Sequence, residues 1–185
     1  MPNAVRSDGI GRPTEGPTVS ADRSGAAPAS VRLVPMTDQE YSSLMDELYR
    51  TYAADHVRAG RWSEAESVQK SREEIGKMLP EGRKTADHLF FTIRAGPGDE
   101  PVGAVWFAFQ PTGAFVYDLE IRSAFRRRGY AEEAMRALEP MARDRGSDHI
   151  RLHVFGDNDG ARKLYRKLGY VETNVLMAKA LGAKD

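Results

Sequence analysis

The feature that most constrains the fold is an almost continuously apolar run from Val102 to Gln110. It follows the segment His88 to Ala95, which is rich in Phe, Leu and Ile, and the turn residues Gly96 to Asp99 separate the two segments. Two strand-like runs joined by a short turn predict an antiparallel hairpin. A second turn, Pro111 to Gly113, leads into a third strand over Ala114 to Ile121. Three consecutive antiparallel strands are therefore expected.

Two helices are expected before this hairpin. Apolar and aromatic residues recur at helical spacing from Tyr41 to Tyr52, after the capping-box sequence Thr37 to Glu40, and the helix should end near Gly60. A second capping box, Ser63 to Glu66, should begin another helix, which Pro80 should end. A short alternating strand, Val31 to Val34, precedes both helices.

The remaining elements alternate between helix and strand. Tyr130 to Arg145 has helical spacing, and Pro140 within it should cause a kink because proline has no N–H to donate. A strand, a short helix and a last strand follow over His149–Phe155, Asp159–Leu168 and Tyr170–Ala180. This order predicts an α/β fold, with a mixed sheet covered by helices on both faces.

Composition narrows the classes of protein that the chain can belong to. Its 185 residues suffice for one domain, which we expect over residues 31–185, after a disordered tail rich in Gly, Pro, Ser and Ala over residues 1–30. With 27 basic and 27 acidic residues, the chain has no overall attraction to nucleic acid or to an acidic membrane. The absence of Cys excludes disulfides, a thiolate nucleophile and a thiolate zinc site. Without a long apolar run or a secretory signal, a cytoplasmic location is expected.

The most informative short stretch is Arg126 to Ala131, RRRGYA, between a predicted strand and a predicted helix. Consecutive N–H groups at the positive end of a helix form a concave donor surface that suits a pyrophosphate, and Gly129 is free to adopt a positive φ there. Arg127 and Arg128 could reach peripheral phosphates, while the small Ala131 would let phosphates approach the backbone. The alternative is a solvated basic run at the start of a helix.

Two motifs in this order resemble those of the GCN5-related N-acetyltransferases, the GNAT superfamily. The first is Leu119-Glu-Ile121 followed by Arg126-x-x-Gly129-x-Ala131, and the second is Asn158-x-x-Ala161-x-x-Leu164-Tyr165-x-x-x-Gly169-Tyr170. The resemblance covers Val31 to Leu181. It implies a mostly antiparallel sheet in which one pair of parallel strands splays apart, and acetyl-CoA as the co-substrate.

The resemblance also assigns cofactor-binding residues. It implies that the pyrophosphate binds the amides of Arg127 to Ala131, that the backbone of Leu119 to Ile121 pairs with the pantetheine arm, and that Asn158 lies beside the cofactor. The full set is Leu119, Ile121, Arg126, Arg127, Arg128, Gly129, Tyr130, Ala131 and Asn158. Glu132 departs from the pattern, because a neutral or basic side chain would suit a phosphate better.

Three residues are candidates for proton transfer. The resemblance implies that Tyr165, seven residues after Asn158, protonates the coenzyme A sulfur; core packing is the alternative. His153 stands where ribosomal-protein N-acetyltransferases of this family have a carboxylate base, and histidine titrates near neutral pH. Glu120 is the second candidate base, although it and Asp118, on the same strand face, could simply attract a cationic amine. No metal site is expected, because two His four residues apart on a strand lie too far apart to share an ion.

The expected activity is transfer of an acetyl group from acetyl-CoA to the primary amine of a small molecule. Two alternatives are acetylation of a protein or peptide amine and non-catalytic binding of an acyl-CoA. Nucleic-acid binding through the arginines near Arg126 is disfavoured by the zero net charge, and no membrane partner is expected. A homodimer is possible because folds of this kind can expose their last strand.

Overall fold

The computed structural model describes residues 30–177 and 179, so nearly all of the expected tail lies outside the described residues. The strands are β1 (Val31–Pro35), β2 (His88–Ala95), β3 (Glu100–Gln110), β4 (Gly113–Ile121) and β5 (Ile150–Leu152). The helices are α1 (Asp38–Arg58), α2 (Glu64–Met78), α3 (Tyr130–Asp144) and α4 (Asp159–Lys167), with 3-10 turns η1 (Gly82–Lys84) and η2 (Ser123–Phe125).

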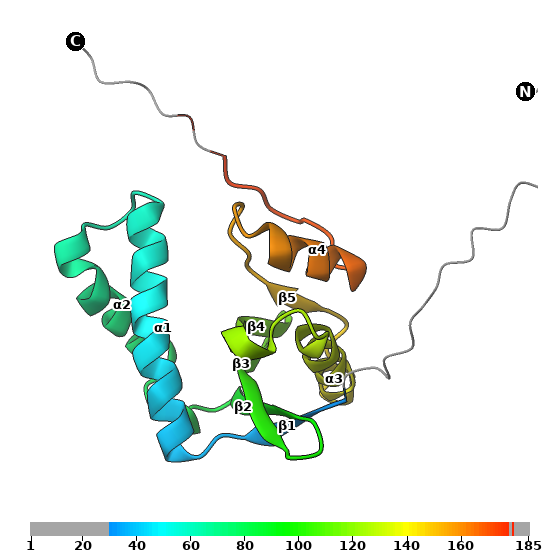
Figure 1. The fold of residues 1–185 in the computed structure, drawn as a ribbon. Coiled ribbons are helices and arrows are strands. Elements are labelled where there is room, and N and C mark those ends of the chain that lie inside the picture. Colours follow the sequence, from blue (N-terminus) through cyan, green and yellow to red (C-terminus); the bar gives the residue numbers. More distant parts are fainter. Residues whose placement is uncertain (1–29, 178, 180–185) are drawn as a thin grey trace, which may run out of the picture.

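The five strands form one sheet in the order β1-β2-β3-β4-β5. Neighbouring strands from β1 to β4 are antiparallel, and β4 and β5 are parallel. Figure 1 shows α1 and α2 on one side of this sheet and α3 on the other. The predicted mixed α/β fold is therefore confirmed. No described helix is both long and apolar enough to cross a membrane.

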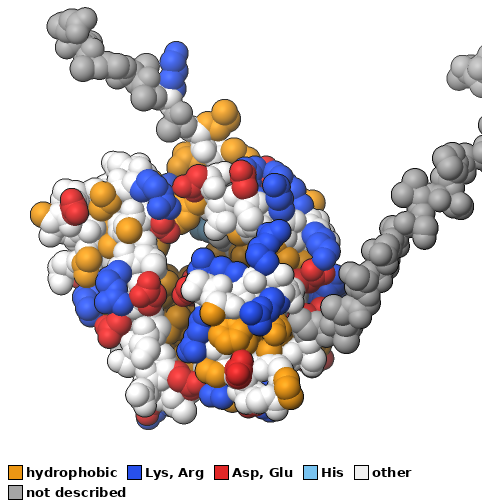
Figure 2. Space-filling model, viewed as in Figure 1, with side chains coloured by type: hydrophobic (Ala, Val, Ile, Leu, Met, Phe, Trp, Pro, Cys, Tyr) orange, Lys and Arg blue, Asp and Glu red, His pale blue; other side chains and the backbone are white. Residues whose placement is uncertain are grey.

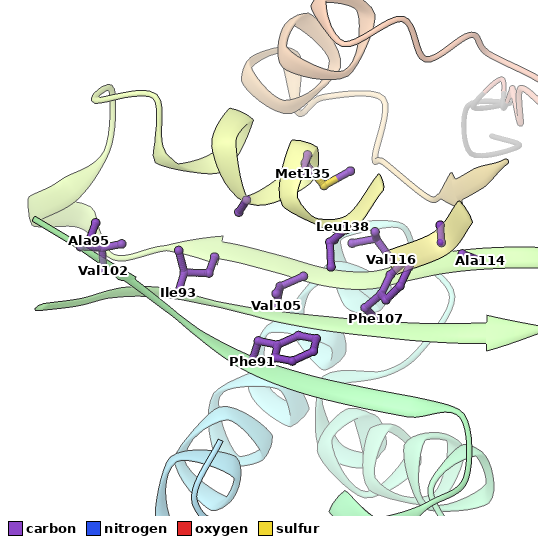
Figure 3. Packing of buried hydrophobic residues seen from close by; sticks show 12 residues of the cluster. Phe91, Ile93, Ala95, Val102, Val105, Phe107, Ala114, Val116, Met135 and Leu138 are labelled. Atoms are coloured by element: carbon purple, nitrogen blue, oxygen red, sulfur yellow. The ribbon is translucent and has the colours of Figure 1, made fainter. Parts of the chain in front are cut away.

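The apolar run in β3 is explained by a core on each face of the sheet. Val105 and Phe107 belong to the cluster that α3 covers, together with Met135 and Leu138 (Figure 3). Trp106, between them in the sequence, belongs to a second cluster under α1 and α2. Because successive strand residues point to opposite faces, a strand buried on both faces needs apolar residues at nearly every position.

The signals for the ends of the first two helices hold, with one exception. Thr37 begins α1 with the predicted capping box: its Oγ1 accepts from the Glu40 N–H at 3.2 Å, and its own N–H donates to the Glu40 carboxylate at 2.9 Å. The second helix ends at Met78, just before Pro80. The exception is Ser63, whose side chain caps no N–H of α2.

Two predicted strands differ from the structure. The strand predicted over His149–Phe155 is only three residues long, because β5 pairs with β4 at Ile150–Leu152 and then diverges from it. The strand predicted over Tyr170–Ala180 is wrong in the described residues, since Tyr170–Met177 have no regular structure. Strand propensity there is high, but no described strand offers it a partner, and unpaired strands are unstable.

Candidate active site

The sheet opens between β4 and β5. Along β4, residues from Gly113 to Ile121 pair with β3, whereas only Ala114–Val116 pair with β5. As a result, no described strand pairs with the β5 side of Tyr117–Ile121. Backbone groups on such an open strand edge can pair with an extended ligand. This opening is the splay of parallel strands that the sequence resemblance implied, and Leu119–Ile121 lie in it.

A β-bulge in β4 lies at the start of this opening. The pairing shifts from Phe107↔Val116 to Trp106↔Asp118, which leaves Tyr117 as the extra residue. Directly paired residues point to the same face of a sheet. Asp118, opposite Trp106, therefore faces the side of α1 and α2, and so does Glu120, whereas Leu119 packs in the core under α3.

Asp118 has a strongly perturbed carboxyl group. Desolvation by burial, together with the negative charge of Glu120, raises the pKa of Asp118 from 3.8 to about 6, against the opposing effect of the Leu119 N–H. The pKa of Tyr165, on α4, is raised by burial and also by the charge of Asp118. The phenol and the carboxyl therefore lie within electrostatic range of each other. Asp118 is on β4 and Tyr165 is on α4, which follows β5, so the two residues come from the two sides of the strand opening.

The turn before α3 has the backbone conformation of an anion-binding site. Arg127 adopts φ +63° and Gly129 adopts φ +85°, with Arg128 between them outside the left-handed region. Alternation of this kind points successive N–H groups into one concavity. Among the described residues, no carbonyl accepts from the N–H groups of Arg127, Arg128 or Gly129. The free N–H groups and positive dipole of the first turn of α3 add to this donor set.

The arginine side chains of this turn have different roles. The guanidinium of Arg126 donates to the Ile121 carbonyl at 2.8 Å and lies 3.6 Å from a Glu120 oxygen. The guanidinium of Arg128 donates to the Ala124 carbonyl at 3.1 Å and covers the ring of Phe125. These two side chains hold the turn against η2 and the end of β4. Arg127 makes no hydrogen bond or ion pair with another described residue, so its charge is available to a ligand.

Glu132, the departure from the family pattern, is occupied by neighbouring cations. Its carboxylate lies 2.5 Å from Lys167 on α4 and 3.0 Å from Arg136. Hydrogen bonds to these two cations hold the pKa of Glu132 below its usual value. The negative charge is thus neutralised and links α3 to α4, which removes the objection to phosphate binding at this turn.

Two other predicted site residues lie near α4 and β5. Asn158 caps α4 by accepting from the Ala161 N–H at 3.1 Å. His153 is exposed just after β5, and its ring meets that of Phe115 edge-on at 5.6 Å. Phe115 precedes the bulge in β4, so His153 lies closer to the start of this strand than Asp118 does. The structure thus brings together Asp118, Glu120 and Tyr165 at the opening, with His153 at its margin.

A hollow separates α1 and α2 from the part of the molecule that carries β4 and α4 (Figure 2). Aromatic rings on this face of β4 pack on one another: Tyr117 stacks on the buried Trp106 at a ring separation of 4.4 Å, and Phe115 lies tilted against Tyr117 at 4.7 Å. At one edge, Arg58 of α1 lies 3.3 Å from Asp157, next to Asn158. The hollow therefore has an aromatic wall and carboxylates on β4.

The aromatic residues of the first two helices are packing residues. Tyr41 packs edge-on against Phe90, and His56 stacks on Trp62 with a ring separation of 4.0 Å. The Tyr52 hydroxyl, 3.1 Å from Glu74, ties α1 to α2. From the sequence, Asp118 is expected only to attract a cationic amine. Its role as a base was missed because the desolvation of its carboxyl depends on the β-bulge at Tyr117, and no sequence pattern shows that bulge.

Comparisons with known proteins agree with this geometry. Residues 43–170 match the acetyltransferase (GNAT) family model. The chain is 34% identical over 153 residues to an uncharacterized N-acetyltransferase of Bacillus subtilis, YdgE, covering 80% of this chain and 97% of that protein. It is also 34% identical to the crystal structure of a putative acetyltransferase from the same species, YycN, with a TM-score of 0.77, covering 83% of this chain and all of the other.

A more distant structure has the same fold. The PaiA N-acetyltransferase from Thermoplasma acidophilum, solved in complex with coenzyme A, is 18% identical, with a TM-score of 0.55 over 79% of this chain and 93% of the other. The family match spans more than half of the chain, and the sheet, its opening and the turn before α3 have the arrangement that the motifs implied. The chain belongs to the GNAT family and is an acetyltransferase.

Proposed function

We propose that this acetyltransferase moves the acetyl group of acetyl-CoA to the primary amine of a small, positively charged molecule. The observation that carries the proposal is that Asp118 and Tyr165 lie within electrostatic range of each other beside the open edge of β4, next to a turn before α3 whose N–H groups pair with no described carbonyl. The pair supplies the two proton-transfer groups that such a reaction needs.

The residues at the opening fit acetyl-CoA. The N–H groups of Arg127 to Ala131 and the free guanidinium of Arg127 suit a pyrophosphate. The unpaired backbone of Leu119–Ile121 suits an extended, amide-containing pantetheine arm. Arg126 and Arg128 support the turn through hydrogen bonds, Tyr130 packs against the core at the start of α3, and Asn158 caps the start of α4. When bound, the cofactor supplies an activated thioester and a thiolate leaving group.

Two side chains would move protons in this proposal. Asp118 accepts the proton that the acceptor amine loses, since a carboxyl with a pKa of about 6 is mostly ionised at pH 7 and still basic enough to act. Tyr165 donates its phenolic proton to the leaving sulfur. His153, directly or through water, and Glu120 are the alternative bases. Glu120 has a second role here, because its charge raises the pKa of Asp118.

The character of the hollow supports a cationic acceptor. Asp118 and Glu120 place negative charge on β4, and the rings of Tyr117 and Phe115 beside them can hold an organic cation over their faces. The ion pair between Arg58 and Asp157 crosses one edge of the hollow, which favours a small acceptor over a folded protein. Acetylation of a peptide amine is the alternative. The cytoplasm stays the predicted location.

The test is a thiol-release assay on the wild-type protein with a panel of amines: diamines, amino sugars, amino-acid amides and lysine-containing peptides. We expect turnover with small cationic amines. Tyr165→Phe should lower kcat at least about tenfold and leave acetyl-CoA binding intact. The matched control is Tyr170→Phe, in a tyrosine whose ring lies 5.7 Å from that of Tyr165 and whose pKa is raised to about 12.

The outcomes separate the alternatives. Turnover with peptides alone would replace the small-molecule acceptor by a peptide. Acetyl-CoA binding without turnover on any amine would favour the non-catalytic acyl-CoA-binding module. Equal loss in Tyr165→Phe and Tyr170→Phe would assign Tyr165 to packing and remove it from the mechanism.

A further inference from the structure

The side chain of Arg151 lies on the same face of the sheet as the proposed base. Ile150 and Leu152, its neighbours in β5, pack in the cluster under α3, so Arg151 between them points to the opposite face. Arg151 pairs with Phe115 of β4, whose ring belongs to the aromatic wall of the hollow. It therefore places a cation on the face that carries Asp118.

The guanidinium of Arg151 is held in place by neutral groups. Its Nη2 donates to the Thr112 hydroxyl and, at 3.5 Å, to the side-chain oxygen of Gln110. No carboxylate in the described part of the chain forms an ion pair with it, and its Nη1 and Nε have no acceptor there. A guanidinium carries five N–H donors, so several of them stay available to an anionic group. Its orientation is fixed in advance by the two hydrogen bonds.

Space for a ligand group lies next to this guanidinium. Arg151 and Gln110 line a cavity of about 530 Å³ at the start of β4, and Arg145 lines it from the end of α3. Asp148 is the one carboxylate among the described residues that line the cavity. Arg145 is already paired with Asp87, at 3.3 Å. Arg151 is therefore the arginine of this cavity whose charge no described carboxylate neutralises.

The side chain of Gln110 connects this cavity to the hollow. Its oxygen accepts from Arg151, and its Nε2 donates to the hydroxyl of Tyr117, the bulge residue before Asp118, at 2.8 Å. Phe115, opposite Arg151, is three residues from Asp118 along β4, which corresponds to about 10 Å of strand. A small extended molecule can therefore reach the carboxylate at one end and the guanidinium at the other.

We propose that Arg151 determines which acceptor is used, by binding a carboxylate at the end of the acceptor opposite to its reacting amine. The amine then lies at Asp118 and Glu120, and the carboxylate lies at Arg151 beside the cavity. The separation favours the terminal amine of a lysine-like molecule over the α-amine of an amino acid, which is adjacent to its carboxylate. This inference rests on the proposed function, because Asp118 sets the position of the amine.

The test compares Nα-acetyl-lysine with Nα-acetyl-lysinamide, in which a neutral amide replaces the carboxylate. Each compound is titrated calorimetrically into the wild-type protein saturated with coenzyme A, so that binding is measured without turnover. We expect Nα-acetyl-lysine to bind at least about tenfold more tightly, because its carboxylate receives charge-assisted hydrogen bonds from Arg151. A hollow that attracts only positive charge predicts the opposite order, since the amide has the larger net positive charge.

Substitutions of Arg151 assign the preference to its guanidinium. The side chain is exposed, so these variants should have the circular dichroism spectrum of the wild type. Arg151→Met should abolish the preference and leave binding of the amide nearly unchanged, whereas Arg151→Lys should retain part of the preference. The matched control is Arg143→Met, which removes the same charge from the last turn of α3, outside the cavity, and should keep the full preference.

The outcomes separate this role of Arg151 from the proposed function. Equal binding of the two compounds by the wild type, binding of neither, or a preference that survives Arg151→Met would overturn the role of Arg151. Acetyl transfer is judged by the thiol-release assay, so turnover of amines with no advantage for a carboxylate would overturn this role alone. Preferential binding of Nα-acetyl-lysine without turnover of any amine would instead overturn the proposed function.

Discussion

Substitution of Asp118 gives a pH dependence whose size can be worked out from the structure. With a pKa of about 6, the carboxyl is ionised in about 90% of molecules at pH 7 and in about 10% at pH 5. If its pKa were the usual 3.8, it would be almost fully ionised at both values. A base with the raised pKa therefore loses about ninefold in activity between pH 7 and pH 5, whereas an unperturbed base loses almost none.

The assay compares kcat/KM of the wild type with that of Asp118→Asn across this pH range. In the ratio of the two, the ionisation of the acceptor amine cancels. We expect the ratio to be about 100 or more at pH 7 and to fall about ninefold by pH 5. Glu120→Gln should shift this fall to lower pH, because removal of the neighbouring charge lowers the pKa of Asp118.

Two results would refute this reasoning. A ratio that does not change between pH 5 and pH 7 would mean that Asp118 is not the titrating base. A near-normal rate in Asp118→Asn, combined with loss of the pH dependence in His153→Gln, would assign the base to His153.

Two further predictions concern stability. The pKa of Asp118 is higher in the folded protein than its usual 3.8, so the folded state loses stability as the pH rises from about 4 to about 6 and does not regain it above that. Asp118→Asn should therefore raise the free energy of unfolding at pH 8 by up to about 3 kcal/mol, measured as a higher melting temperature, and have little effect below pH 4. A Cβ at Gly103 would lie 2.2 Å from the Glu120 carbonyl oxygen, so Gly103→Ala should cost about 1–3 kcal/mol in urea unfolding and lower kcat/KM, because it displaces β4 at the site. Gly76→Ala, in α2 with no atom near the added Cβ, is the control and should be stabilising by up to about 1 kcal/mol; equal effects of the two changes would contradict the close approach of β3 and β4.

The fold was predictable where local signals and burial agree. Thr37 and Glu40 specify the start of α1 through hydrogen bonds between residues only three positions apart. The apolar run in β3 indicates a strand that is buried on both faces, as the structure shows. The prediction of the last strand was wrong because the sequence after Tyr170 indicates only strand propensity. A strand also needs a neighbouring strand to pair with, and none lies beside this segment in the described residues.

The site was predictable to a different extent in its two parts. The turn at Gly129 is local, so a glycine between a strand and a helix indicated its positive φ. The raised pKa of Asp118 depends instead on the bulge at Tyr117, on the charge of Glu120 and on α4, which folds back from a distant part of the chain. No local pattern encodes that combination, and the sequence therefore favoured Glu120 and His153 as bases.

The central claim, that acetyl-CoA binds at the turn before α3, is tested most directly by calorimetric titration. Acetyl-CoA is titrated into the wild type, Gly129→Asp and Gly146→Asp. Both glycines have positive φ, but Gly146 lies beyond the other end of α3 and away from the opening. We predict binding to the wild type and Gly146→Asp, and at least about tenfold weaker binding to Gly129→Asp, because a carboxylate enters the donor set. Equal binding by all three proteins, or none by the folded wild type, would contradict the account.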